Sequence, residues 1–521
     1  MTKDSRRHTS SLRLALLSLI LVSLTLGLAQ TTETTPATIL ELPEGFTAER
    51  VADGLTFPTS VAWDDQGRMW IAEAGGGFQP EQLEPSRLLR IDNSEVVETL
   101  ELSEHLIPPV VGLTFHDGHF YITHRDMNDM TGAVSRVAMD GSVEQILTGF
   151  RDARAEHFMN GIEVGPDGRL YFGVGQAGNS GVMGPDVGPF IMLNPDLHSV
   201  PCEDLTLLGH NFMVPDFRVM DEDENGEDEE GPMVLTGAFV PFGEVTQPGQ
   251  VVPGEEKCGG AVFSFDPADA EGSLERFAWG MRQPIGITWN EAGEMFVGEN
   301  GYDIRGARPV QDEHDATLRV RQGVWYGFPD FSAAREPLTD PGFDIPEEAK
   351  EDAQPPVVRG EDEELGRTLT FVIDHEASGL TPPDQADVVG LHPFNSSPSQ
   401  LDVAPAEWGD FAGHLFVAEW GDLAPPTNPL REEPVGYRVV RIDPATGELT
   451  PFVSNQLPGP ASEQDPFGEG MERPFDVKFG PDGAMYIVDY GVVEIDMELE
   501  PPYDYIAGTG AVWRVSRGSG Q

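Results

Sequence analysis

The sequence predicts an all-β fold, a six-bladed β-propeller with long loop insertions. The first observation is a unit of strand, turn and strand, often followed by further strands, that recurs along the chain. Turn signals such as Pro166-Asp167-Gly168 separate the apolar runs and favour hairpins. One such unit cannot bury both of its faces, so similar units are expected to stack around a common axis. The hairpins of the six units span residues 57–73, 110–123, 162–172, 283–299, 399–419 and 473–489.

The second observation concerns the two ends of the chain, each of which carries a strand outside these units. Residues 46–51 predict a lone strand near the N-terminus, and residues 510–515 predict another near the C-terminus. If these two strands share one sheet, they close the ring and leave no exposed sheet edge. The propeller domain is therefore expected to span residues 42–517.

The N-terminal segment has the pattern of an export signal. A basic start is followed by an apolar run at residues 14–28 that ends in small residues. This pattern predicts a signal peptide over residues 1–29, and residues 30–41 are expected to form a Thr-rich spacer. The protein is then exported, to the periplasm or the extracellular space. No other run reaches the roughly 18 apolar residues of a membrane span, so none is expected.

The composition is strongly acidic. The chain has 89 acidic residues against 32 basic residues, for a formal net charge of −57. Such a charge disfavours nucleic acid as a partner, because phosphate binding requires basic residues. It is consistent with a solvated surface and does not indicate a reaction.

Two long insertions interrupt the repeated units, at residues 201–258 and 330–381. The first contains Cys202 and Cys258, the only cysteines, and in an exported chain a disulfide between them is expected. The second is rich in Pro, Glu and Asp, and is expected to lie over one face as irregular structure.

Part of the first insertion resembles a calcium-binding loop. Asp221, Asp223 and Asn225 match ligand positions of an EF-hand loop, but Pro232 stands where the final bidentate Glu belongs. A bound calcium ion and a merely solvated acidic loop are both compatible with this segment.

Polar residues just before the innermost strands are the first candidates for a site, because these segments surround the central channel of a propeller. Such residues are His157 and Asn160 in the third unit, Arg282 and Gln283 in the fourth, and Arg473 in the sixth. A histidine at this place can act as a base or be purely structural. Two arginines facing one cavity favour an anionic ligand, unless each pairs with a nearby acid.

A series of short motifs resembles the glucose/sorbosone dehydrogenase family. In order they are His157-x-x-Asn160-Gly161 with GPDGRLYFGVG, then GMRQPIG at 280–286, Glu299-Asn300-Gly301, WYGFP at 325–329 and Glu472-Arg473-Pro474. Members known as soluble aldose dehydrogenases are six-bladed propellers that hold pyrroloquinoline quinone (PQQ) and calcium. In them a histidine removes a hydroxyl proton from the sugar while hydride passes to the quinone.

The resemblance implies a role for each matching residue. His157 would be the general base, and the backbone carbonyls of Gly301 and Tyr302 would bind the cofactor's calcium. A carboxylate-bearing cofactor needs cationic partners, and calcium prefers hard oxygen ligands. The residues expected to contact the cofactor are Arg282, Gln283, Asn300 and Arg473.

The expected function is that of an exported quinoprotein that oxidises a sugar, a polyol or a sugar aldehyde. The chain has no Cys-x-x-Cys-His motif for attached haem, so electrons would pass to an external acceptor. Two alternatives remain at this point. One is a cofactor-free propeller that serves as a binding or interaction module, and the other is a calcium-dependent, lactonase-like hydrolase.

Overall fold

The regular secondary structure of the protein consists mostly of β-strands. Among the residues that the computed structural model describes, the only α-helices are the short α1 (Gly188–Leu193) and α2 (Lys350–Ala353). The all-β prediction is therefore confirmed. The described residues are 39–76, 78, 83–219, 221–222, 228–229, 231–464, 469–499 and 501–518.

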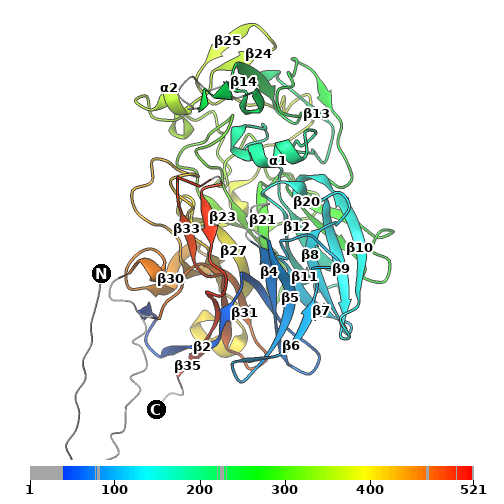
Figure 1. Ribbon diagram of the computed structural model, residues 1–521, viewed down its shortest axis with the longest axis vertical. Coiled ribbons are helices and arrows are strands. Elements are labelled where there is room, and N and C mark those ends of the chain that lie inside the picture. Colours follow the sequence, from blue (N-terminus) through cyan, green and yellow to red (C-terminus); the bar gives the residue numbers. More distant parts are fainter. Residues whose placement is uncertain are drawn as a thin grey trace, which may run out of the picture. The chain divides into compact units, whose positions relative to one another are not determined.

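Six antiparallel sheets of four or five strands correspond to the six predicted units (Figure 1). The first two sheets contain β3 (Pro58–Trp63), β4 (Met69–Gly76), β5 (Leu83–Asp92) and β6 (Glu95–Glu101), then β7 (Leu113–His116), β8 (His119–Arg125), β9 (Gly132–Ala138) and β10 (Val143–Phe150). The third and fourth contain β11 (Met159–Val164), β12 (Leu170–Val174), β19 (Ala261–Phe265) and β20 (Glu275–Trp279), then β21 (Gln283–Trp289), β22 (Met295–Asn300), β23 (Asp315–Val320) and β26 (Val388–His392). The fifth contains β27 (Pro398–Val403), β28 (Leu415–Glu419), β29 (Arg438–Asp443), β30 (Glu448–Asn455) and β1 (Leu40–Glu41).

The sixth sheet joins the two ends of the chain. It contains β31 (Pro474–Phe479) and β32 (Met485–Asp489), followed by β35 (Gly510–Arg517) and then β2 (Phe46–Leu55). Strand β2 pairs with β35, and both lie side by side in Figure 1. The predicted pairing of the N-terminal and C-terminal strands is therefore present.

The first strands of the six sheets follow one another in a closed cycle. Strand β3 contacts β7, β7 contacts β11, β11 contacts β21, β21 contacts β27, β27 contacts β31, and β31 contacts β3. This arrangement is propeller-type. It places the residues that enter these strands around a common axis, where the sequence predicted a site.

Tight turns and apolar packing explain why these segments form stacked hairpins. In the third sheet Gly168 has φ 80°, a conformation that suits glycine, and its N–H donates to the carbonyl of Gly165 at 2.9 Å. Between the first and second sheets, Trp70 and Phe120 are fully buried with ring centroids 5.0 Å apart. Burial of each such side chain stabilises the fold by about 2 kcal/mol.

The two insertions meet in a further sheet. Strands β14 (His210–Pro215) and β17 (Met233–Gly237) come from the first insertion, and β24 (Val357–Arg359) and β25 (Glu363–Gly366) come from the second. They form one four-stranded sheet in the order β17-β14-β24-β25, near the top of Figure 1. The expectation of irregular structure was therefore wrong for β24 and β25, because the edge of β14 offers them backbone hydrogen-bond partners.

The remaining described features are a disulfide and small two-stranded sheets. The disulfide links Cys202 and Cys258 within the first insertion. No helix in the described ranges is long and apolar enough to cross a bilayer. The remaining two-stranded pairs are β13 (Leu205–Thr206) with β18 (Val251–Val252), β15 (Asp221–Glu222) with β16 (Asp228–Glu229), and β33 (Val493–Ile495) with β34 (Tyr503–Tyr505).

Some predicted features lie outside the described residues. They are the signal peptide at 1–29, the spacer up to residue 38, and Asp223 and Asn225 of the calcium-like loop. Only the backbone of Asp221 is described. These features remain predictions.

Candidate functional site

A cavity of about 370 Å³ lies where the chain enters the first strands of several sheets. His157 and Phe158 line it just before β11, and Arg282 and Gln283 line it at the start of β21. The segment between β12 and the first insertion, with η2 (Pro185–Val187) and the beginning of α1, contributes further lining residues. The cavity lies at the entrance to these strands, where the propeller geometry predicts a site.

His157 is held in one orientation in the wall of this cavity. Its Nδ1 lies 2.9 Å from the backbone carbonyl oxygen of Gln176. A carbonyl can only accept, so we assign the ring proton to Nδ1, which leaves Nε2 with a free lone pair. Nε2 lies 3.5 Å from Oε1 of Glu156, and the imidazole side chain is only 9% exposed.

Burial determines the charge state of His157. Loss of hydration lowers the pKa of this histidine well below its usual value, and the nearby cations Arg282 and Arg305 lower it further. The hydrogen bond to Gln176 acts in the opposite direction. The imidazole is therefore neutral at neutral pH and can accept a proton at Nε2.

Arg282 is fixed by a carboxylate and by an asparagine. Its Nη2 donates to Oδ2 of Asp303 at 2.8 Å, and its Nε donates to the backbone carbonyl of Asn179 at 2.9 Å. The backbone N–H of Arg282 donates to Glu299 at 2.8 Å. The acid pairing foreseen as the alternative for this arginine is therefore present, although Arg282 still lines the cavity.

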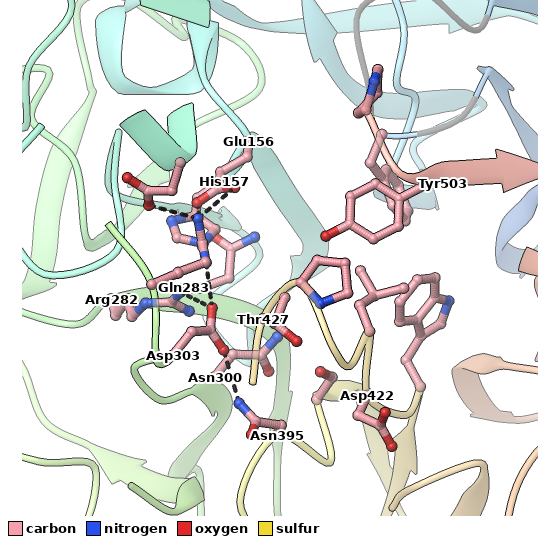
Figure 2. A pocket seen from close by; sticks show the side chains of 18 of the residues that line it. Glu156, His157, Arg282, Gln283, Asn300, Asp303, Asn395, Asp422, Thr427 and Tyr503 are labelled. Atoms are coloured by element: carbon pink, nitrogen blue, oxygen red, sulfur yellow. Dashed lines mark hydrogen bonds and ion pairs between the residues drawn. The ribbon is translucent and has the colours of Figure 1, made fainter. Parts of the chain in front are cut away.

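A second arginine, Arg305, is clamped by three acids. It pairs with Glu156 at 2.5 Å, with Asp186 at 2.9 Å and with Asp303 at 2.9 Å. Burial raises the pKa of Asp186 to about 6, although Arg305 opposes this shift. Figure 2 shows two acids of this network, Glu156 and Asp303, on the side of the cavity that carries Arg282 and His157.

Two amide side chains complete this wall. Gln283 and Asn160 pair through reciprocal amide contacts of 3.3 Å. Asn300, the last residue of β22, lines the cavity, and its buried Oδ1 has no hydrogen-bond partner among the described residues. A buried oxygen without a partner is costly in free energy, so this atom is a ready acceptor for a ligand or a cation.

The segment after Asn300 is held by buried carboxylates. The N–H of Gly301 donates to Oδ1 of Asp315 at 2.7 Å, and the N–H of Tyr302 donates to Oε2 of Glu313 at 2.8 Å. Burial raises the pKa of Asp315 to about 6 and that of Glu313 well above its usual value. Gly301 lines the cavity, whereas the hydroxyl of Tyr302 donates to the carbonyl of Phe331 at 3.0 Å.

Arg473 does not line the cavity. Its guanidinium lies over the ring of Trp420, 4.3 Å from the centroid, and 4.8 Å from that of Tyr437. It also donates to the backbone carbonyl of Asp422 at 2.9 Å. Trp420 and Asp422 both line the cavity, so Arg473 supports the wall from behind.

Aromatic side chains also line the cavity. The rings of Phe78 and Phe158 stack with centroids 4.8 Å apart, and Phe78 and Tyr490 stack at 5.1 Å. Tyr503, from β34, faces the polar wall across the cavity in Figure 2. The remaining aromatic lining residues are Phe190, Trp420, Phe475 and Tyr505.

Sequence reasoning found one wall of the cavity and missed the rest. The structure brings together His157, Arg282, Gln283, Asn300 and Gly301. Their sequence neighbours, namely Glu156 before His157 and both Asp303 and Arg305 after Tyr302, carry charge and could have been added to the prediction on that basis. No sequence signal indicated that Tyr503 and Tyr505 of β34 would cross over to the cavity.

The residues present fit the cofactor that the resemblance implies. PQQ is a tricarboxylate with a flat ring system, and the cavity combines guanidinium and amide groups with aromatic surfaces. The unpartnered Oδ1 of Asn300 is a hard oxygen of the kind that calcium binds, directly before Gly301. The described residues contain no group of three or more His, Cys, Asp or Glu side chains that could hold a metal ion.

The cavity wall carries more negative than positive charge. Its cationic lining residues are Arg282 and Arg305. An anionic cofactor would therefore meet repulsion unless a cation accompanied it. The carboxylate-bearing lining residues are Glu156, Asp186, Asp303, Asp315 and Asp422.

Comparison with known proteins identifies the fold. No protein-family profile matches the chain, and no curated protein matches it. Among solved structures, the PQQ domain of pyranose dehydrogenase from Coprinopsis cinerea matches with a TM-score of 0.51 and 15% identity, over 93% of this chain and 98% of that one. A Carbohydrate-Active Enzymes Family AA12 protein from Trichoderma reesei matches with a TM-score of 0.50, 15% identity and the same coverage.

A bacterial structure, the PQQ-bound aldose sugar dehydrogenase from Streptomyces coelicolor, matches at 14% identity with a TM-score of 0.46, over 91% of this chain and 100% of that one. At such identities the likeness is one of fold. The chain thus resembles the propeller-type, PQQ-dependent sugar dehydrogenases in its architecture.

Proposed function

We propose that this chain is an exported, six-bladed propeller oxidoreductase that oxidises a sugar, a polyol or a sugar aldehyde with PQQ and calcium. The observation that carries the proposal is the buried, neutral imidazole of His157, which lines a cavity and whose Nδ1 is anchored by a carbonyl. The likeness in fold to the PQQ domain of pyranose dehydrogenase supports it.

The residues of the cavity would have separate roles in the reaction. Nε2 of His157 accepts the proton of a substrate hydroxyl, and the carbonyl of Gln176 keeps the ring in the required tautomer. The aromatic wall around Phe158 excludes water and offers an apolar face to a sugar ring. When bound, PQQ supplies a two-electron acceptor for hydride.

The cofactor would lie against the polar wall. Arg282 and Gln283 would hold it through their donors, and Asn300 Oδ1 with the Gly301 carbonyl would face its calcium. Arg473 would act indirectly, because it fixes Trp420 and Asp422 rather than the ligand. Electrons would leave to an external acceptor.

The acidic residues that line the cavity predict that PQQ binding depends on calcium. PQQ should bind the purified apoprotein in the presence of calcium and should not bind in the presence of a chelator, because the five lining carboxylates repel a bare tricarboxylate. Cofactor absorbance after gel filtration measures binding, and dye reduction with a panel of aldoses, polyols and sugar aldehydes measures turnover. Absence of binding under both conditions would contradict the proposed function.

The role of His157 is tested by substitution. His157→Ala should reduce kcat by about 100-fold or more, because it removes the general base. The matched control is His119→Ala. His119 is the first residue of β8 and is not one of the residues that line the cavity. Activity retained in His157→Ala would show that another group accepts the proton.

A further inference from the structure

Nε2 of His157 faces a fixed carboxylate. Glu156 Oε1 lies 3.5 Å away, whereas Nδ1 is already used by the carbonyl of Gln176. With the ring proton on Nδ1, both Nε2 and Oε1 are acceptors, and no hydrogen lies between them. The separation exceeds that of a good hydrogen bond and would shorten only when a proton arrives.

Glu156 is held in this position by Arg305. Nη1 of Arg305 donates to Oε2 of Glu156 at 3.1 Å, and Nη2 donates to Oε1 at 2.5 Å. Arg305 is itself anchored by Asp186 and Asp303. Side-chain exposures of 18% for Glu156 and 11% for Arg305 leave the pair largely shielded from water. The carboxylate therefore cannot easily turn away from the imidazole.

We infer that Glu156 is the charge partner of His157, a positioning residue that stabilises the imidazolium formed during substrate oxidation. The inference rests on the proposed function and deepens it. The hydroxyl proton of the substrate passes to Nε2, and the hydrogen on the same carbon leaves with its electron pair to the two-electron acceptor. The new imidazolium is then flanked by the carboxylate of Glu156 on one nitrogen and by the Gln176 carbonyl on the other.

The surroundings explain why the base needs such a partner. Burial and the positive charges of Arg282 and Arg305 oppose a charged imidazole. The other charged groups near the pair, Asp186 and Asp303, are engaged by the two arginines. Glu156 is the carboxylate in contact with the ring itself. An opposite charge at this range favours the charged form of a histidine by roughly one to three pKa units.

The test measures the titration of His157 in the apoprotein, without cofactor or substrate. NMR of protein labelled at histidine follows the imidazole, and the resonance is assigned by its loss in His157→Asn. Glu156→Gln should lower the pKa of His157 by about one unit or more, a tenfold shift of the protonation equilibrium. Glu156→Asp keeps the charge and should restore most of the difference.

Asp186→Asn is the matched control, because it also removes one carboxylate from Arg305 but does not touch Nε2. It should shift His157 clearly less than Glu156→Gln does. An unchanged or raised pKa in Glu156→Gln, or an equal shift in Asp186→Asn, would overturn the inference. A thermal melt of each variant confirms that it is folded.

The kinetic consequence is a second readout. In the active enzyme Glu156→Gln should lower kcat more than it raises KM, because the carboxylate acts on the charged state and not on the bound substrate. Failure of PQQ to bind would contradict the proposed function but would not affect the titration of His157 in the apoprotein. An unchanged pKa of His157 in Glu156→Gln would contradict only the role of Glu156.

Discussion

Gly301 occupies a point in the cavity wall where no side chain can be accommodated. A Cβ built there would lie 1.6 Å from Oε2 of Glu313 and 2.4 Å from the carbonyl oxygen of His314. Glu313 cannot move aside without releasing the N–H of Tyr302, which it accepts. The glycine therefore allows the chain to pass close to a buried carboxylate, and the same closeness presents the segment's backbone to the cavity.

Gly301→Ala should lower the free energy of unfolding by about 2 kcal/mol or more, because relief of the overlap must displace a buried, hydrogen-bonded acid. Gly518→Ala is the control, since its nearest atom would be 3.5 Å away. Urea unfolding curves of the two variants measure the difference. Equal stability of the two would show that Glu313 has room to shift.

For single residues, a position at the entrance to the first strand of a sheet was enough to predict that His157, Arg282 and Gln283 lie together. The fold itself brings those positions around one axis. The environment of each side chain could not be read in the same way. Both arginines were expected to face a ligand. Arg282 lines the cavity but also pairs with Asp303, and Arg473 packs on Trp420 behind the wall. Such pairings depend on loops that converge only in three dimensions.

Strands and turns were largely predictable from the sequence. Each of the six predicted hairpins is present, within a few residues, because alternating apolar runs and Asp-Gly turns are local signals. The sheet made by the two insertions was not foreseen. Its pair Asn211 and Val358 brings together segments far apart in the sequence, and short-range patterns cannot encode such pairing.

The inner strand β31 carries a buried acid that makes the fold sensitive to pH. Burial raises the pKa of Asp476 to about 8, and its Oδ2 accepts the N–H of Val61 in β3 at 3.1 Å. The unfolded carboxyl ionises near pH 4. Between these values unfolding releases a proton, so this residue makes the protein less stable as pH rises.

The free energy of unfolding of Asp476→Asn, compared with that of the unsubstituted protein, should therefore increase by about 2 kcal/mol as pH increases from about 5 to about 7. The amide cannot ionise but keeps an acceptor for Val61. Urea unfolding at both pH values measures the change in the difference, with Asp65→Asn at an exposed turn as control. A difference that stays constant with pH would mean that Asp476 is already ionised in the folded protein.

For the whole molecule, the net charge of −57 is the dominant electrostatic fact. Like charges repel within the folded chain, and salt screens that repulsion over a Debye length of about 10 Å at 0.1 M. Surface ion pairs such as Arg514 with Asp482 act in the opposite direction but contribute little each.

Raising NaCl from about 20 mM to about 500 mM, in the presence of a chelator, should therefore raise Tm by several degrees. Differential scanning calorimetry measures this, and potassium chloride at equal ionic strength is the control for a specific ion effect. A lower Tm in salt would show that ion pairs outweigh the general repulsion.

The pairing of β2 with β35 has a consequence for how the molecule can be made. Strand β35 lies between β2 and β32 in the sixth sheet, so a chain that ends before β35 leaves both of these strands with an unpaired edge. Because β2 and β35 are neighbours, a short linker could join them and new ends could be opened at a surface turn without breaking the ring.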